Sequence, residues 1–346
     1  MFKGKKLILF LSILLVFMLL LSACGSNKPA DTTDQDVEET DVNGEDTTEE
    51  TTEDSGDGEL IVAQGADPVS LDPHASNDQP SSRVNKQIYD TLVEATEDME
   101  LKPGLAEDWE QIDENTWKFI IRQGVKFHNG EELKASDVKF TLDRMMDSGE
   151  VAHIVGAVSS VEIEDDYTII LKTEEPFAPI LAHLAHTAAS ILNEKAVTEA
   201  GEDYQNSPIG TGPFKFVRHD SGDKVILERF DDYYKGPAKV KTVIFRNIPE
   251  GTNRTIGLET GEVDIAYEIE PIDMATVREH ENLVLVEEPS LSTAYIGFNL
   301  KKEPFNNILV RKALNHAIDV EEIIDKVLEG AGTRATGPIN DKVFAY

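Results

Sequence analysis

The first candidate for chemistry is Ser136-Asp137-Val138-Lys139, which has the S-x-x-K spacing of the serine nucleophile in penicillin-binding enzymes. The partner motifs S-D-N and K-T-G do not occur in the sequence, and Ser136 is predicted to cap a helix that runs to Met146. His183 and His186 are three residues apart, a spacing that can hold a metal, but no acidic residue nearby completes a compact ligand set. We therefore predict no nucleophile, no metal site and no cofactor here.

Other enzyme signatures are also missing from the sequence. It contains no H-E-x-x-H, G-x-S-x-G, phosphate-loop or dinucleotide-binding motif. His74, His128 and His219 fall in different segments and show no catalytic-triad order. The sequence thus favours a protein that is not an enzyme over a cell-surface hydrolase.

Cys24 is the only cysteine, so a disulfide within the chain is impossible. A basic start and an apolar run over residues 7–21 precede it, and this run is short for a membrane span. The sequence Leu21-Ser22-Ala23-Cys24 resembles a bacterial lipobox. The resemblance implies a signal peptide over 1–23 and a lipid-modified Cys24, with acyl chains such as palmitate holding the protein on the membrane.

Residues 24–58 are predicted to form a disordered acidic tether between this anchor and the folded protein. Between residues 25 and 58 there are thirteen Asp or Glu, one lysine and only two apolar residues larger than alanine. Such a segment buries too little surface to offset its ordering entropy. The chain carries −34; residues 1–24 contribute +3 and residues 25–58 contribute −12, which leaves −25 for the folded part. This charge argues against binding to nucleic acid.

Hydrophobic periodicity predicts a mixed α/β fold for the remainder. Strands are expected at 60–63, 116–122, 167–173, 225–229, 240–246 and 283–287. Helices are expected at 136–146, 307–318 and 320–329, the last ending at Gly330, and around an apolar face of Val84, Ile88, Leu92 and Ala95.

Several positions have predicted structural roles. Trp117 and Phe119 belong to the core of their strand, and Asn129-Gly130 forms a turn. Gly210 and Gly212, followed by a proline, fit a tight passage of the backbone where a side chain would obstruct.

The stretch WKFIIRQGVKFHNGEELKASDVKFTL (117–142) resembles the signature region of family 5 extracellular solute-binding proteins. These proteins are the dipeptide-, oligopeptide- and nickel-binding components of ABC importers. Further similar segments follow in the family's order: SLDPH (70–74), KPGLAEDW (102–109), SPIGTGPFKFV (207–217), LERFDDYYKGPA (227–238), ETGEVDIAY (259–267) and YIGFNLKKEPFNNILVRKALNHAID (295–319). Together they cover residues 60 to about 338.

The resemblance implies a periplasmic-binding-protein-like clamp of two lobes (type II) with an extra inserted domain. Lobe I is expected from 59–92 and 208–294, the inserted domain from 93–207, and an incomplete, truncated second lobe from 295–346. A monomer on the extracytoplasmic face of the cell membrane is expected to capture short peptides and deliver them to an ABC permease.

The resemblance also indicates where a ligand would bind. Ser76, Asn77 and Asp78 occupy the position that faces the cleft in the family, although a plain surface loop is the alternative. In dipeptide-binding relatives, the charged residues that hold the peptide termini lie beyond the position of residue 346. Capture of nickel or a metal chelate, or peptide sensing by a surface lipoprotein, are the alternative functions; LAHLAHTAASIL lacks an arginine of the sort that nickel binders present there.

Overall fold

The computed structural model describes residues 58–288, 290–339 and 343. The expected signal peptide, Cys24 and nearly all of the acidic tether lie outside the described residues, so these features stay predictions. Among the residues that the structure describes, no helix is long and apolar enough to cross a membrane.

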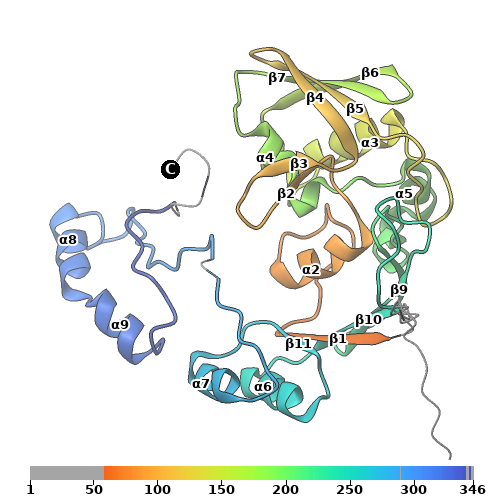
Figure 1. Ribbon diagram of the computed structural model, residues 1–346. Helices are drawn as coiled ribbons and strands as arrows, with labels where there is room; N and C mark the ends of the chain where they lie inside the picture. Colours follow the sequence, from red (N-terminus) through yellow and green to blue (C-terminus); the bar gives the residue numbers. More distant parts are fainter. Residues whose placement is uncertain (1–57, 289, 340–342, 344–346) are drawn as a thin grey trace, which may run out of the picture. The chain divides into compact units, whose positions relative to one another are not determined.

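A five-stranded sheet with the order β11-β1-β10-β9-β8 is built from segments far apart in the sequence (Figure 1). Its strands are β1 (Glu59–Gln64), β8 (Phe214–Asp220), β9 (Lys224–Arg229), β10 (Thr242–Asn247) and β11 (Ile265–Ala266). Strand β1 is parallel to both of its neighbours, β10 and β11, whereas β8, β9 and β10 pair antiparallel. The carboxyl ends of three parallel strands therefore meet at one edge.

A second sheet has four antiparallel strands in the order β4-β5-β7-β6. Its strands are β4 (Ala106–Asp113), β5 (Thr116–Ile121), β6 (Val158–Asp165) and β7 (Thr168–Thr173), and a separate pair joins β2 (Val93–Ala95) to β3 (Leu101–Pro103). In β5, Trp117, Phe119 and Ile121 are buried while the alternate residues are half-buried, which confirms the predicted alternation. Helix α3 (Ala135–Met146) covers this sheet with Val138, Leu142 and Met145 buried, as predicted.

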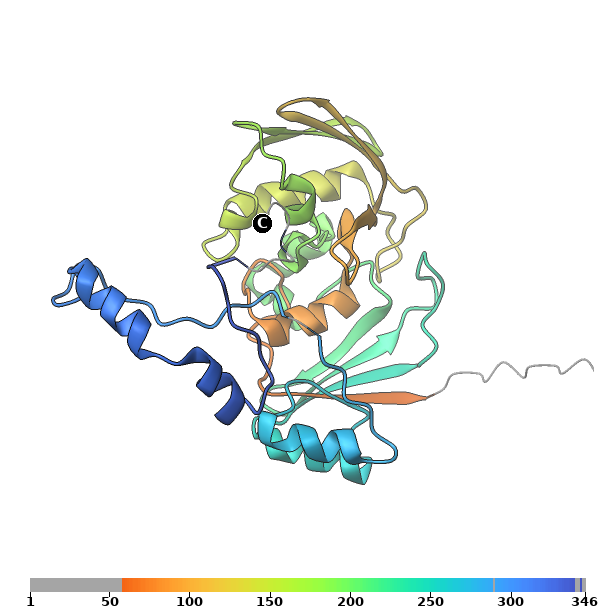
Figure 2. The ribbon, with the colours of Figure 1, turned by 60° about the vertical axis from the view of Figure 1, so that its left-hand side comes forward.

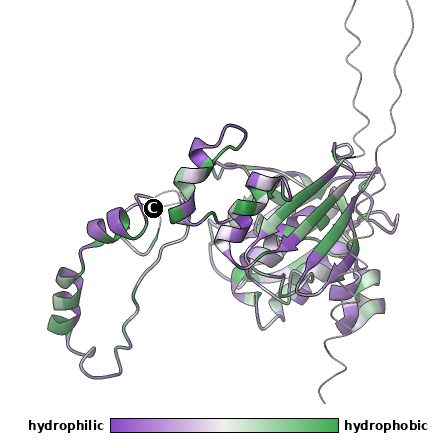
Figure 3. Cartoon of the chain, turned by 90° about the horizontal axis from the view of Figure 1, so that it is seen from below, coloured by the Kyte–Doolittle hydropathy of each residue, from purple (hydrophilic) through white to green (hydrophobic). Residues whose placement is uncertain are grey.

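The buried residues form two hydrophobic clusters. One spans Leu92 to Ile191 and includes the buried residues of the four-stranded sheet and of α3. The other joins the five-stranded sheet to α2 (Gln79–Ile88) and to Leu192, Val197 and Tyr204. Figure 3 shows hydrophobic stretches along the strands of the sheets. The chain passes from the first cluster to the second between Ile191 and Leu192. The predicted limits of the inserted domain, residues 93 and 207, stay predictions.

Two predicted helix ends are wrong. Helix α2 stops at Ile88 because Tyr89 adopts an extended backbone, so Leu92 and Ala95 lie beyond the helix, and Ala95 pairs in β2. Helix α3 is capped at Lys134, not at Ser136; the Asp137 side chain accepts the Lys134 N–H at 3.0 Å. An acidic residue at the third helical position makes this contact in capping boxes.

The remaining helical segments are short. They are η1 (Ala152–Ile154), α4 (Ile180–Leu184), η2 (Thr187–Ala189), α5 (Glu194–Ala200), η3 (Gly201–Asn206), α6 (Gly251–Thr260), α7 (Pro271–Glu279), α8 (Ile308–Ala317) and α9 (Val320–Lys326). Helices α6 and α7 lie side by side in Figures 1 and 2.

The segment from residue 283 onward differs from the prediction in two places. Residues 283–287 form no strand, because they pair with no other described segment. Helix α9 ends at Lys326 instead of residue 329, although Gly330 does adopt the left-handed backbone expected near a helix end. Neither α8 nor α9 contains a buried residue.

Candidate functional site at the carboxyl ends of the parallel strands

The parallel strands β1, β10 and β11 end at Gln64, Asn247 and Ala266. In open α/β sheets, ligands bind outside the carboxyl ends of the strands. The loop after β1 leads directly to α2, so residues 64–88 form one border of this edge. We define the carboxyl-end site by Gln64, Asn247, the β1–α2 loop and α2.

Buried polar atoms without a hydrogen-bond partner concentrate at this site. Folded proteins pair nearly all such atoms, so each exception needs a reason. Of the eight unpartnered atoms among the described residues, seven belong to the carboxyl-end site and one is the Tyr234 hydroxyl. The seven are Gln64 Oε1, both ring nitrogens of His74, Ser76 Oγ, Arg83 Nη1, Asn85 Oδ1 and Asn247 Oδ1. This concentration is what a polar ligand or ordered water would satisfy.

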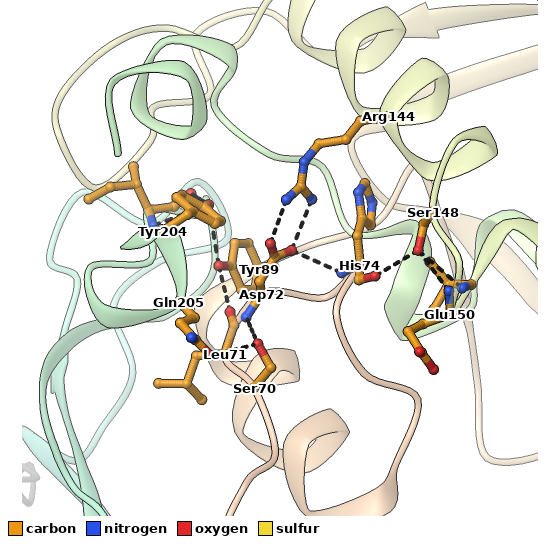
Figure 4. Close-up of polar contacts among 12 residues, drawn as sticks. Ser70, Leu71, Asp72, His74, Tyr89, Arg144, Ser148, Glu150, Tyr204 and Gln205 are labelled. Atoms are coloured by element: carbon orange, nitrogen blue, oxygen red, sulfur yellow. Dashed lines mark hydrogen bonds and ion pairs between the residues drawn. The ribbon is translucent and has the colours of Figure 1, made fainter. Parts of the chain in front are cut away.

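An ion pair holds the β1–α2 loop in place (Figure 4). Arg144 of α3 donates from Nη1 and Nη2 to the two carboxylate oxygens of Asp72, at 3.0 and 2.5 Å. Asp72 is 6% exposed and also accepts the His74 N–H at 3.0 Å. Burial alone would raise the pKa of Asp72, but the hydrogen bonds from Arg144 and His74 and the charge of Arg144 lower it. The carboxylate therefore stays ionised and fixes the loop.

Hydroxyl groups fasten the same loop from other elements. The Tyr89 hydroxyl donates to the Leu71 carbonyl at 3.0 Å, and the Tyr204 hydroxyl lies 3.3 Å from the Tyr89 hydroxyl (Figure 4). Ser148 donates to the His74 carbonyl at 2.8 Å. The SLDPH segment thus has a structural role: it gives the site a rigid border.

The three predicted ligand residues lie in the β1–α2 loop, but they differ in what they can contribute. Asp78 caps α2, accepting the Ser81 N–H at 2.9 Å and the Ser81 hydroxyl at 2.7 Å. Asn77 is exposed, and Ser76 Oγ is buried without a partner among the described residues. Their roles in ligand binding stay predictions, with Ser76 the residue whose polar atom is unused.

Gly210 and Gly212 make the close backbone approach that the sequence predicts. A Cβ atom built on Gly210 would lie 2.1 Å from the Ile88 carbonyl oxygen, and one on Gly212 would lie 2.6 Å from the Ile88 carbonyl carbon. The Gly212 N–H donates to the same carbonyl oxygen at 2.9 Å. This passage therefore locks the carboxyl end of α2, and with it one border of the carboxyl-end site.

His128 also holds the Gly210–Gly212 backbone in place, through both of its ring nitrogens. Its Nε2 lies 2.9 Å from the Gly212 carbonyl oxygen, which can only accept, so Nε2 carries the proton and Nδ1 accepts the Gly210 N–H at 3.3 Å. Burial lowers the pKa of His128 to about 4, so the ring is neutral at pH 7. The Asn129-Gly130 turn that follows is confirmed, with Gly130 in the left-handed region.

We predict that acid destabilises the fold through His74, which is 4% exposed. Burial, and then the charge of Arg144, lower its pKa from the ordinary 6.5 to about 4. As the pH falls below 6.5, the unfolded chain takes up a proton that the folded chain refuses until about pH 4. The free energy of unfolding should therefore fall by up to about 3 kcal/mol across this window.

A His74→Phe variant tests this prediction, because it replaces the buried imidazole with a ring that cannot take up a proton. Urea unfolding at pH 4.5–7 should show a pH dependence shallower than that of the wild type by up to about 1.4 kcal/mol per pH unit. The exposed His153→Gln serves as the control. Equal slopes for His74→Phe and the wild type would contradict the prediction.

The other sequence candidates have structural contacts of their own. His183 Nδ1 lies 2.5 Å from the Ile154 carbonyl oxygen, and His186, which lies outside α4, accepts the Ala188 N–H on Nδ1 at 3.1 Å. Within the described residues, no three His, Cys, Asp or Glu side chains are grouped closely enough to hold a metal. Ser136 lines a depression of about 530 Å³ with acidic neighbours such as Glu131 and Glu194, and none of its lining residues belongs to the carboxyl-end site.

Sequence reasoning missed most of the carboxyl-end site. Gln64, Arg83, Asn85 and Asn247 lie in regions expected to be strand, helix or connection, with no motif of their own. Only the strand topology could have indicated these residues, because Gln64 and Asn247 are the last residues of parallel strands. This indication requires knowing which strands pair in parallel.

Comparison with known proteins identifies the class. The family model of bacterial extracellular solute-binding proteins, family 5 (Middle), matches residues 100–346. The chain therefore belongs to this family, and the predicted family and α/β fold class are confirmed.

Individual relatives agree with this assignment. The glutathione-binding protein GsiB of Pectobacterium atrosepticum is 34% identical over 291 residues, which are 82% of this chain and 56% of GsiB. The structure of DppA from Helicobacter pylori, in complex with the peptide STSA, is 31% identical with a TM-score of 0.78, covering 84% of this chain and 62% of DppA. NikZ from Campylobacter jejuni, in complex with Ni(L-His), is 26% identical with a TM-score of 0.73, covering 81% and 57%. The chain spans about half the length of the curated relatives it matches.

Proposed function

We propose that this protein is the lipid-anchored solute-binding component of an ABC importer, which captures short peptides outside the membrane and delivers them to a permease. In this role it carries out no bond chemistry. Ligand binding favours one conformation of the protein, and that conformation is presented to the permease. A monomer suffices for this task.

The observation that carries the proposal is the set of unpartnered polar atoms at the carboxyl-end site. The unpartnered amide oxygens of Gln64, Asn85 and Asn247 are acceptors, and the Ser76 hydroxyl can both donate and accept. These groups suit the N–H and C=O groups of a peptide backbone. Membership of family 5 and the peptide complex of DppA support the same ligand class.

Two other ligands have support from particular relatives. Glutathione, named in GsiB, is itself a tripeptide and falls within the proposed class. A nickel chelate is the second candidate because of the Ni(L-His) complex of NikZ. The chelate would bring its own metal ligands, so it does not require a metal-binding cluster in the protein.

Calorimetry on the full-length protein separates these candidates. Trialanine, glutathione and Ni(L-His)₂ are titrated separately at pH 7. We expect heat from trialanine or glutathione and none from the chelate. Binding of the chelate alone would contradict peptide capture and favour the nickel candidate.

Import and sensing differ in a genetic test. Deletion of the gene should abolish growth on short peptides as the only source of a required amino acid. Normal growth, together with a lost transcriptional response to peptides, would instead favour the surface-sensor alternative.

The lipid anchor makes a separate prediction. Cys24 would carry the acyl chains, each of which adds roughly 0.8 kcal/mol of membrane affinity per buried CH₂. A Cys24→Ser variant should therefore move from the membrane fraction to the soluble fraction and lose incorporation of labelled palmitate. Ser22→Thr, next to the same site, is the control and should keep the label. A Cys24→Ser protein that stays labelled and membrane-bound would contradict the anchor.

A further inference from the structure

Asp90 lies where the chain passes between the two hydrophobic clusters. Leu92, two residues later, belongs to the first cluster, which contains the four-stranded sheet, and Tyr89 belongs to the second, which contains the five-stranded sheet. The side chain of Asp90 is 7% exposed. A carboxyl group is costly to bury, so the fold must gain something from the contacts that this one makes.

Asp90 contacts two further connections between the clusters. In the glycine passage, Ile209 packs against the first cluster and Phe214 belongs to the second. Thr211, which is fully buried between the two glycines, donates its hydroxyl hydrogen to Asp90 Oδ2 at 2.9 Å. The Asp90 carbonyl oxygen accepts the Ile191 N–H at 2.9 Å, at the step where the chain returns from the first cluster to the second.

The same carboxyl group reaches a fourth connection, which follows β9. There Tyr234 packs against the first cluster and Ala238 against the second. The Tyr233 hydroxyl donates to Asp90 Oδ1 at 3.0 Å, and Lys235 Nζ lies 3.8 Å from the same oxygen. One buried side chain therefore lies at the meeting point of four segments that join the clusters.

The surroundings of Asp90 contain both opposing and supporting charges. Burial raises the pKa of Asp90, and the charge of Glu94 adds to the rise. The charge of Lys235 and the two hydroxyl hydrogen bonds oppose it. Lys235 is shared, because it also pairs with Glu94 of β2. The hydroxyl bonds from Thr211 and Tyr233 are thus the contacts that belong to Asp90 alone, and a carboxyl group can make them with or without its proton.

A buried polar group whose partners are all in place can specify one arrangement of the elements around it, because other arrangements leave it unpaired. Asp90 has this property for four connections at once. We propose that Asp90 couples the two hydrophobic clusters into one cooperative unit, so that neither sheet opens without the other. The inference concerns the free protein, so it holds whichever ligand binds at the carboxyl-end site.

Hydrogen exchange of the full-length protein at increasing urea concentration, followed by mass spectrometry, tests the inference without a ligand. Residues 116–121 and 168–173 report opening of the four-stranded sheet, and residues 224–229 and 242–247 report opening of the five-stranded sheet. In the wild type, both sheets should lose protection at the same urea concentration, as one cooperative unit does. In Asp90→Ala the two losses should separate by roughly 0.5 M urea or more, the shift expected when one part of the protein loses a hydrogen-bonding centre.

Tyr233→Phe provides a milder variant in case Asp90→Ala does not fold. It keeps the ring and removes one of the two hydroxyl bonds, so the two losses should separate by about half as much. The matched control is Tyr167→Phe, which removes a hydroxyl bond to the Glu132 carboxylate at 2.7 Å beside the first cluster. Its two losses should stay together.

The inference is overturned if the two sheets lose protection together in both Asp90→Ala and Tyr233→Phe, or if they already lose it separately in the wild type. A separation in Tyr167→Phe as large as that in Tyr233→Phe would also overturn it, since any lost hydroxyl bond would then have the same effect. Because no ligand is used, failure of trialanine, glutathione and the chelate to bind would contradict the proposed function and leave this inference standing.

Discussion

A Gly210→Ala variant is expected to lose about 3 kcal/mol of unfolding free energy or more, or to fail to fold. The added methyl group would lie 2.1 Å from the Ile88 carbonyl oxygen and 2.6 Å from the Tyr89 ring. Overpacking costs about 1–3 kcal/mol when side chains can adjust, and here the nearest obstacle is backbone. The carboxyl end of α2 would have to move, so weaker ligand binding should accompany the lost stability. Urea unfolding followed by circular dichroism measures the effect.

Gly149→Ala is the matched control for this variant. No atom lies within 4 Å of a Cβ built there, and the backbone is not in the left-handed region. Its unfolding free energy should stay within about 0.5 kcal/mol of the wild type. A Gly210→Ala protein as stable as Gly149→Ala would show that the passage is looser than the structure indicates.

An Asp72→Asn variant is expected to lose about 3 kcal/mol of unfolding free energy. Asp72 is 6% exposed and bonds both outer nitrogens of Arg144, so its loss would leave a partly buried guanidinium without a counter-charge. Breaking a buried pair from one side costs about 3–5 kcal/mol, and the 29% exposure of Arg144 puts this case at the low end. The β1–α2 loop would also lose its anchor.

The exposed pair of Arg218 and Asp220 provides the comparison. Their side chains are 57% and 40% exposed, and such pairs contribute little. Asp220→Asn should change the unfolding free energy by less than about 1 kcal/mol. Similar losses for Asp72→Asn and Asp220→Asn would contradict the structural role of the Asp72–Arg144 pair.

Sequence patterns predicted the elements that bury one face. The alternation around Phe119 and the stripe through Leu142 each imply a single secondary structure, and both were confirmed. The glycines at 210 and 212 were also interpreted correctly, because a Gly-x-Gly-Pro run implies close backbone contact.

Other features depend on contacts that no local pattern encodes. Apolar spacing continues past Ile88, yet α2 ends there because the chain turns toward the other hydrophobic cluster. Ser136 was predicted to cap α3, but the side chain that makes the capping contact is Asp137, which accepts the Lys134 N–H. The carboxyl-end site needs the parallel pairing of β1 with strands about 180 and 200 residues later, which the sequence does not reveal.

Hydrogen–deuterium exchange with and without ligand tests the central claim most directly. The probe is whichever of trialanine, glutathione or Ni(L-His)₂ gives heat in calorimetry. Binding at the carboxyl-end site predicts slower exchange in residues 64–88 and 265–268. Unchanged exchange in those segments, with protection confined to the acidic depression at Glu131 and Glu194, would contradict the account.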